Sequence, residues 1–347
     1  MRKRVIKLIT VMCITTLSIV GCGNSNDKVE EPIISENGLM GSNEPTDVNV
    51  GLIMGPPSMG LGYFMNEAEN KATYNNYNFE VVNTDYATLA AKLNTGDIDI
   101  ATLPSNVAPI LYNNKELQEE IQVISIGNLG VLYVLTSDKS INEIEDLKGR
   151  TVYSIGEGGT PEYTFDYILE EKDLLGKVNF EFRATPFEVL NLLQAEKDAI
   201  ALLPQPFVEV AKILVPGVNV AIDVTEAWES IENENNAESV TTVTVARRKF
   251  IEQHEQAVIE YLDFSKKSTD YTLQNIEESA AWTEKYETFM STDIAVKAIP
   301  ECSIVTISGE EMKELLNPFI KIMYDLNPDA VGGSIPDDEF YYIKRKK

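Results

Sequence analysis

The chain has 347 residues, and its 55 Asp and Glu against 29 Lys and Arg give a formal net charge of −26 at pH 7. An acidic surface repels phosphates, which argues against nucleic acid as a partner. With one histidine and three cysteines, the sequence offers neither a disulfide framework nor the His and Cys pairs of a zinc site.

The first 22 residues have the pattern of an export signal. Basic residues at 2–4 precede an apolar stretch, interrupted by Lys7, that ends in Ile-Val-Gly-Cys at 19–22. The stretch is too short for a good membrane span. Its ending resembles a bacterial lipobox, so we expect residues 1–21 to be a signal peptide and Cys22 to be acylated, for example with palmitate; a plain secretory signal is the alternative. An acylated Cys22 would anchor the protein to the extracytoplasmic face of the cell membrane.

Residues 22–47 are predicted to form a lipidated start and a flexible tether. They are rich in Gly, Asn, Ser, Glu and Pro and lack apolar periodicity. The remaining residues, about 300, exceed what a single core usually supports, which predicts two lobes.

Strands and helices alternate in the first half of the folded part. Apolar periodicity predicts strands at 48–54, 79–82 and 98–103 and helices at 61–72 and 87–93. The same order returns about 100 residues later, with strands at 151–155, 178–182 and 199–203 and helices at 160–171 and 186–195. Ile-Ala-Thr-Leu-Pro at 100–104 matches Ile-Ala-Leu-Leu-Pro at 200–204, which supports two similar α/β lobes.

The remaining segments suggest how the lobes are joined. We expect strands at 121–126, 131–136 and 240–246, and only helices after 248. The prediction is a first lobe of residues 48–136 plus 241–347, a second lobe of residues 137–240, and two hinge crossings between them.

Ligands of open parallel sheets bind beyond the carboxyl ends of the strands, which selects the loops 55–60, 104–106, 156–160 and 204–206. Thr160 before Pro161 is predicted to cap a helix, and the glycines before it, Gly158 among them, would leave N–H groups open to a ligand. The alternative is an ordinary capped helix. Ser105, Asn106, Asp85 and Asn128 are likewise either ligand contacts or local caps and turns.

Catalytic groups are scarce. Ser58, in Pro-Pro-Ser-Met-Gly, lacks the first glycine of a nucleophile elbow and has no histidine nearby. Cys302 is expected to be a small buried hydrophobe, and His254 to lie on the surface. We therefore expect no catalytic residue.

Four motifs together carry a resemblance to a family. They are Gly-Asp-Ile-Asp-Ile-Ala-Thr-Leu-Pro at 96–104, Asp-Leu-Lys-Gly-Arg-Thr-Val at 146–152, Gly-Gly-Thr-Pro-Glu at 158–162 and Ala-Leu-Leu-Pro-Gln-Pro at 201–206. With the lipobox, they resemble the nitrate/sulfonate/taurine and thiamine-precursor type substrate-binding lipoproteins of ABC transporters, over roughly residues 48–265. The resemblance implies a type II periplasmic-binding-protein fold, with two α/β lobes of mixed sheets, and capture of a small molecule between the lobes. It also implies a permease and an ATPase as partners and no catalysis, and it adds no cofactor or metal.

The resemblance also implies a set of pocket residues, carried over motif by motif: Ser58, Met59, Asp85, Ser105, Asn106, Asn128, Gly159, Thr160 and Gln205. Gln205 departs from the family, because many members carry glutamate in that loop. The four loops hold no Lys or Arg, and Tyr63 is available to a heteroaromatic ring. These features favour an uncharged or zwitterionic organic molecule, with oxyanions as the alternative.

Two other functions stay open. One is an enzyme of the same fold that acts on a pyrimidine or menaquinone precursor, although the export signal and the solitary histidine disfavour it. The other is a surface lipoprotein that senses a ligand.

Overall fold

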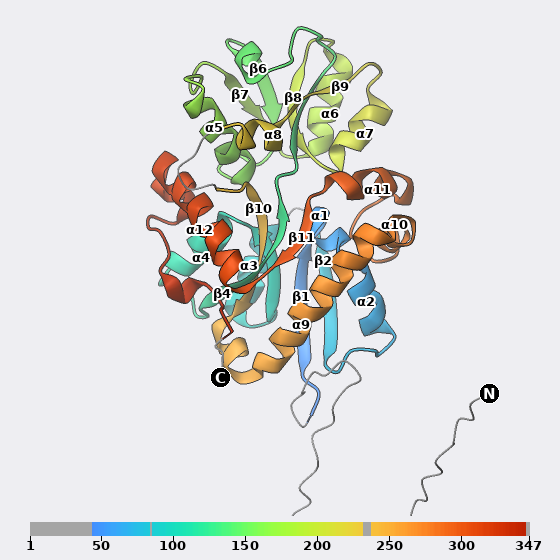
Figure 1. Cartoon of the computed structure of the whole chain (residues 1–347), viewed down its shortest axis with the longest axis vertical. Coiled ribbons are helices and arrows are strands. Elements are labelled where there is room, and N and C mark those ends of the chain that lie inside the picture. The colour runs from blue at the N-terminus through green and yellow to red at the C-terminus, as the bar shows by residue number, and fades with distance from the viewer. Residues whose placement is uncertain (1–43, 84, 232–236, 345–347) are drawn as a thin grey trace, which may run out of the picture. The chain divides into compact units, whose positions relative to one another are not determined.

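The computed structural model describes residues 44–83, 85–231 and 237–344 (Figure 1). The signal peptide, the acylated Cys22 and nearly all of the tether predicted above lie outside these residues.

The first sheet is mixed and has the order β11-β4-β10-β3-β1-β2. Strand β1 runs parallel to β2 and β3, whereas β10 is antiparallel to β3 and β4, and β11 is antiparallel to β4. Its strands are β1 (Asp47–Ile53), β2 (Asn76–Val82), β3 (Ile100–Pro104), β4 (Ile121–Leu129), β10 (Val240–Arg247) and β11 (Ile304–Ile307).

The second sheet repeats this order as β7-β6-β8-β5-β9. Its strands are β5 (Leu132–Thr136), β6 (Thr151–Ser154), β7 (Asn179–Phe182), β8 (Ile200–Pro204) and β9 (Asn219–Asp223). Strand β6 is parallel to β7 and β8, and β5 is antiparallel to β8 and β9. The matching pentapeptides of the sequence form β3 and β8, which hold the same position in their sheets. The predicted structural repeat is therefore present.

The chain crosses between the sheets twice. Strand β4 ends at Leu129 in the first sheet and β5 begins at Leu132 in the second; the return crossing leads from β9 to β10. The predicted first lobe extends to residue 136, whereas β5 pairs with β8 and β9 of the second sheet. The physical reason is burial, because all five residues of β5 are covered when it lies between β8 and β9 in the second sheet.

Helices connect the strands of both sheets. The chain of the first sheet carries α1 (Pro56–Met59), α2 (Gly62–Glu69), α3 (Tyr86–Thr95) and α4 (Val107–Asn113). The chain of the second carries η1 (Ile144–Leu147), α5 (Thr160–Glu171), α6 (Pro186–Ala195), α7 (Phe207–Leu214) and α8 (Val224–Glu229). The predicted helices at 160–171 and 186–195 are found with these bounds.

The segment after β10 is mostly helical. It contains α9 (Arg248–Gln274), α10 (Ile276–Lys285), α11 (Thr292–Ala298), η2 (Ile299–Glu301), α12 (Gly309–Leu326), η3 (Pro328–Val331) and η4 (Asp338–Phe340). Helix α9 packs against α2 and β11, and α12 contacts α5 of the other half (Figure 1). The expectation of helices alone is wrong at β11, where Ile-Val-Thr-Ile, a β-branched run, pairs with β4.

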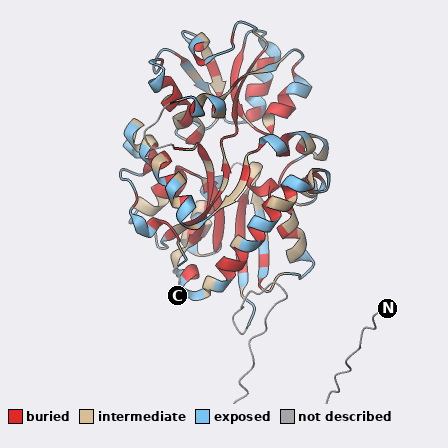
Figure 2. Cartoon of the chain, in the orientation of Figure 1, coloured by how far each residue is buried: buried red, intermediate tan, exposed pale blue. Residues whose placement is uncertain are grey.

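Buried apolar residues are continuous across the two halves. One cluster contains Leu103 and Val243 of the first sheet together with Val152 and Leu202 of the second. Buried positions follow the strands of both sheets and the inner faces of the helices (Figure 2). None of the helices within the described residues combines the length and the apolar character needed to cross a bilayer.

Candidate functional site

The candidate site lies where the carboxyl ends of the parallel strands of the two sheets meet. Ser105 and Asn106 directly follow β3, and Thr160 begins α5 after β6. All three side chains are buried, with at most 2% of their surface exposed. The fold thus brings together residues from equivalent strands of the two halves.

Hydrogen bonds join these residues across the halves. Thr160 Oγ1 donates to Asn106 Oδ1 at 3.0 Å and lies 3.2 Å from Ser105 Oγ, while Asn106 Nδ2 donates to the carbonyl of Gly158 at 3.3 Å. We call Ser105, Asn106, Gly158 and Thr160 the cross-sheet cluster. Four of the predicted pocket residues therefore contact one another directly.

The cross-sheet cluster is attached to the crossing segments. Ser105 donates from its hydroxyl to the carbonyl of Val240 at 2.6 Å and from its backbone N–H to the carbonyl of Thr241 at 3.0 Å. Asn128 is fully buried beside them; its Nδ2 donates to the carbonyl of Leu129, and its Oδ1 accepts from the hydroxyl of Thr242. A relative movement of the halves would therefore change the hydrogen bonds of the cluster.

The glycine loop differs from the prediction. Helix α5 starts at Thr160 with Gly159 as its N-cap, so the Thr160 hydroxyl reaches the other half instead of capping its own helix. The N–H of Gly158 donates to the carboxylate of Glu162, and the N–H of Gly159 donates to the carbonyl of Gly156 at 2.9 Å. These two N–H groups, which we expected to be open to a ligand, already have protein partners.

Gln205 lies at the end of β8, beside β6. Its backbone N–H donates to the carbonyl of Val131 at 2.9 Å, which ties it to the first crossing. The side chain is 2% exposed, and its Oε1 is buried without a hydrogen-bond partner. Buried polar atoms are rarely left unsatisfied, so this oxygen is a candidate for contact with a bound molecule.

The remaining predicted pocket residues serve other contacts. Ser58 donates to the carbonyls of Ile53 and Gly55 at 2.7 and 3.0 Å, and Met59 is fully buried in an apolar cluster. Asp85 caps α3 by accepting from the N–H and hydroxyl of Thr88, which hold its pKa below the ordinary value. It is exposed, as expected of a local cap.

Tyr63 lies among helices. Its ring stacks on Tyr271 with centroids 4.7 Å apart, and Trp282 lies 6.2 Å away. Burial and the neighbouring Glu67 carboxylate raise the pKa of Tyr63. These contacts belong to the packing of α2 on α9 and α10, and none of the hydrogen bonds described for the cross-sheet cluster involves Tyr63.

Sequence reasoning missed two members of this neighbourhood. Glu162, which holds the glycine loop, and Thr242, which bonds Asn128, are not among the predicted pocket residues. A glutamate in the first turn after a glycine-rich loop is a recognisable signal for the first. Thr242 contacts Asn128 because β10 pairs with β4, and the sequence does not reveal which of its distant segments pair.

Comparisons with known proteins agree with this architecture. No family model matches the chain. It is 24% identical over 261 residues to "Outer membrane lipoprotein 3" of Mannheimia haemolytica, covering 74% of this chain and 89% of that protein.

Two solved structures share the arrangement over nearly their whole length. An ABC transporter protein from Parabacteroides distasonis superposes with a TM-score of 0.71 at 23% identity, covering 87% of this chain and 100% of the other. The periplasmic aliphatic sulphonate binding protein SsuA of Escherichia coli has a TM-score of 0.67 at 16% identity, with 84% and 96% covered. The chain has the type II periplasmic-binding-protein fold.

The structure shows the surroundings of the two side chains considered as catalytic groups, Cys302 and His254. Cys302 is fully buried, and burial followed by the nearby carboxylates Glu301 and Glu209 raises the pKa of its thiol, which disfavours the nucleophilic thiolate. His254 is half-buried, not on the open surface as expected, with Nδ1 3.3 Å from Thr46 Oγ1. Within the described residues, no group of three or more His, Cys, Asp or Glu side chains is placed to hold a metal ion.

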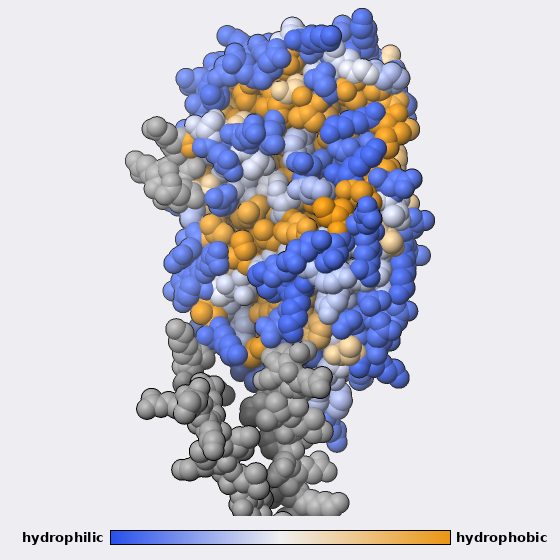
Figure 3. All heavy atoms as spheres, turned by 45° about the vertical axis from the view of Figure 1, so that its right-hand side comes forward, coloured by the Kyte–Doolittle hydropathy of each residue, from blue (hydrophilic) through white to orange (hydrophobic). Residues whose placement is uncertain are grey.

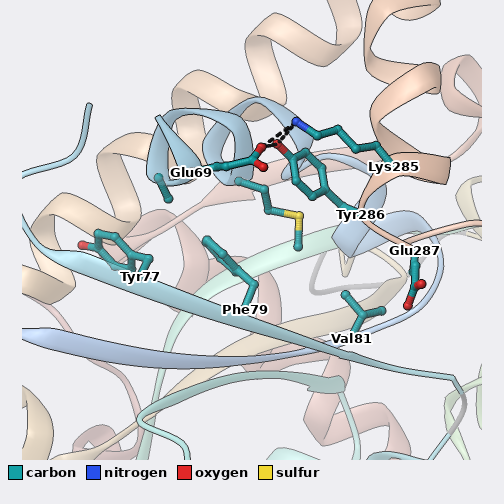
Figure 4. A pocket seen from close by; sticks show the side chains of 9 residues that line it. Glu69, Tyr77, Phe79, Val81, Lys285, Tyr286 and Glu287 are labelled. Atoms are coloured by element: carbon teal, nitrogen blue, oxygen red, sulfur yellow. Dashed lines mark hydrogen bonds and ion pairs between the residues drawn. The ribbon is translucent and has the colours of Figure 1, made fainter. Parts of the chain in front are cut away.

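A surface hollow of about 380 Å³ lies between α2 and the edge strand β2. Tyr77, Phe79 and Val81 of β2 line it on one side; on the other, Glu69 bonds Lys285 at 2.6 Å and the hydroxyl of Tyr286 at 2.8 Å (Figure 4). None of its lining residues belongs to the cross-sheet cluster.

Apolar side chains also reach the surface over the second sheet. Phe187 of α6 and Ile213 and Leu214 of α7 are all more than 40% exposed. On the face shown in Figure 3, hydrophobic surface gathers in the upper part and in a band across the middle, between strongly hydrophilic areas. This face is therefore less polar than the net charge of the chain suggests.

Proposed function

We propose that the protein is an extracytoplasmic, lipid-anchored solute-binding protein of an ABC importer. It captures a small molecule between two lobes, one built on each sheet, and delivers it to a permease driven by an ATPase. The observation that carries this proposal is the cross-sheet cluster, in which buried side chains from equivalent loops of the two halves hydrogen-bond to each other.

The cluster gives a physical basis for closure. Thr160, Asn106 and Ser105 exchange hydrogen bonds with one another where the halves meet, so these groups become available only when the halves separate. A molecule that binds groups of both halves stabilises the closed arrangement by the difference between its affinities for the two states. The crossings at Leu129–Leu132 and at Val240, to which Ser105 is bonded, are the natural hinge.

The comparisons and the amino terminus support the same role. Proteins with this fold are named as an ABC transporter component and a sulphonate-binding protein, and the sequence relative is named a lipoprotein. The lipobox ending at Cys22 agrees with such an anchor. The buried Cys302 and the distant His254 provide no nucleophile and base at the cluster, so the proposed role is non-catalytic.

The test is a thermal-shift screen of the purified protein against sulfonates, nitrate, pyrimidines, vitamins and amino-acid derivatives. A molecule present at 100 times its dissociation constant adds about 2.7 kcal/mol to the free energy of unfolding. We expect at least one class to raise the melting temperature, and the Asn106→Ala variant to lose that increase while remaining folded. A screen in which no compound changes the melting temperature, and in which native mass spectrometry finds no small molecule carried by the protein, would contradict the proposal.

A further inference from the structure

The charge and hydrogen-bonding character of the site restrict the molecule that it accepts. This inference rests on the proposed function and concerns the chemical class of the captured molecule.

The position that an anion would take is already occupied by a carboxylate of the protein. The N-terminus of a helix attracts anions through its free N–H groups and its dipole. At α5, Glu162 of the first turn accepts from the N–H of Gly158, and Gly156 accepts from the N–H of Gly159. The loop therefore presents a negative charge where an oxyanion needs donors.

The side-chain donors beside this loop are also engaged. The hydroxyl of Thr160 donates to Asn106, that of Ser105 donates to Val240, and the amide of Asn106 donates to Gly158. Two buried side-chain oxygens of this half have no hydrogen-bond partner: the hydroxyl of Thr164 in α5, which can donate or accept, and the Oε1 of Gln205, which can only accept.

Further carboxylates lie at the same edge of the second sheet. Tyr133 of β5 pairs with Asp223 at the end of β9, next to the Leu132–Pro204 pair that precedes Gln205. Burial is the main cause that raises the pKa of the Tyr133 phenol, and the negative charges of Asp223 and Glu301 add to it. An oxyanion entering this region would be repelled.

Compensating positive charge is scarce at this edge. The loops that follow β1, β3, β6 and β8 contain no Lys or Arg. Arg183, which follows β7, is bonded at 2.9 Å both to Glu181 and to the carbonyl of Phe182. Arg183, which follows the strand next to β6, is thus neutralised by groups of β7 itself.

We infer that the molecule held at this site presents an N–H or O–H donor to Oε1 of Gln205 and carries no net negative charge. Such a molecule satisfies the buried Oε1 of Gln205, and it avoids repulsion by Glu162 and Asp223. Uncharged amino-heterocycles and organic cations belong to this class, whereas sulfonates and nitrate do not.

The test compares two sets of probes by thermal shift and calorimetry on the full protein. The anionic set is nitrate, sulfate and ethanesulfonate; the donor set is cytosine, ethanolamine, spermidine and amino-acid amides. The variants are Gln205→Met, which keeps the length but removes the acceptor, and Gln205→Glu, which keeps an acceptor. Gln253→Met, at an exposed position of α9, is the matched control.

We expect a donor probe to stabilise the wild type, and the anions to have no effect. Gln205→Met should weaken binding of that probe about tenfold, the loss expected for one hydrogen bond to a buried acceptor, while Gln205→Glu and Gln253→Met retain it. Glu162→Ala removes the blocking carboxylate, so ethanesulfonate should bind this variant more tightly than it binds the wild type.

Four results would overturn the inference. Stabilisation of the wild type by an anionic probe, or equal affinity of wild type and Gln205→Met for a donor probe, contradicts it while capture itself stands. No change of ethanesulfonate binding in Glu162→Ala contradicts the role given to that carboxylate. If neither set nor the wider screen stabilises the protein, the proposed function fails and the inference fails with it.

Discussion

Thr160 Oγ1 donates a hydrogen bond to Asn106 Oδ1, 3.0 Å away, and so joins the first residue of α5 to the residue that follows β3 in the other sheet. Both side chains are buried, which makes this bond stronger than a surface contact of the same length. It is the shortest measured link within the cross-sheet cluster between the two halves.

Replacing Thr160 by Val should loosen the contact between the halves. The substitution keeps the shape but removes the donor, which leaves Asn106 Oδ1 without this partner and costs about 1 kcal/mol in the closed arrangement. We expect amide hydrogen exchange in residues 156–160 and 105–106 to become roughly fivefold faster. Thr151→Val, at the start of β6, is the control. Unchanged exchange in both loops would show that the bond does not hold the halves together.

Stability should depend on pH through Asp166 of α5. Burial, followed by repulsion from Glu162 and Glu170, raises the pKa of its carboxyl from 3.8 to about 6. Between about pH 4 and pH 6 the folded protein therefore holds more protons than the unfolded chain, and the stability contributed by this group falls as the pH rises through that window.

The Asp166→Asn variant removes this dependence. Near neutral pH its free energy of unfolding should exceed that of the wild type, by less than about 1 kcal/mol because solvent screens a half-buried group. The difference should disappear toward pH 4. Urea unfolding across this range measures it, with the exposed Glu171→Gln of the same helix as the control. A difference that grew on acidification would contradict the assignment.

Glu260 of α9 should be a major contributor to stability. Its buried carboxylate accepts from the N–H of Tyr74 at 2.6 Å, the N–H of Asn75 at 3.0 Å and the hydroxyl of Tyr77 at 3.2 Å, and also from the Asn75 side chain. Glu260→Leu leaves the buried backbone and side-chain donors of Asn75 without their acceptor, so we expect it to lower the free energy of unfolding by about 3 kcal/mol.

Denaturant unfolding tests this prediction against Glu252→Leu, at an exposed position of α9 before its kink at His254. The control should change the free energy of unfolding by less than about 0.5 kcal/mol. Equal effects of the two substitutions would mean that water replaces the hydrogen bonds of the Glu260 carboxylate without a loss of stability.

Much of the fold could be predicted from local pattern. The alternation of strands and helices, the repeat and the equivalence of the segments 100–104 and 200–204 all follow from apolar periodicity, because each element buries one face or stripe. The misplaced boundary at 136 had a different cause. An apolar run such as 132–136 is compatible with either sheet. Only its pairing with β8 and β9 shows that it belongs to the second.

The candidate site was predictable in part. Ser105, Asn106 and Thr160 were selected because they follow strands, and the structure brings these three together. Which groups remain available to a ligand was not predictable. It depends on Glu162 reaching back to Gly158 and on the unsatisfied oxygen of Gln205, both of which are set by three-dimensional contacts.

The strands of one sheet come from a single continuous stretch of the chain, whereas those of the other do not. This difference affects the order in which the sheets can form during synthesis. All strands of the second sheet come from one uninterrupted stretch, Leu132 to Asp223, whereas the first sheet places β10, from residue 240 onward, between β3 and β4 and completes its edge with β11 at Ile304–Ile307. A growing chain thus possesses every strand of the second sheet while the first still lacks the strand that joins its two parts. The half that comes second in the sequence is therefore the earlier one able to complete its sheet.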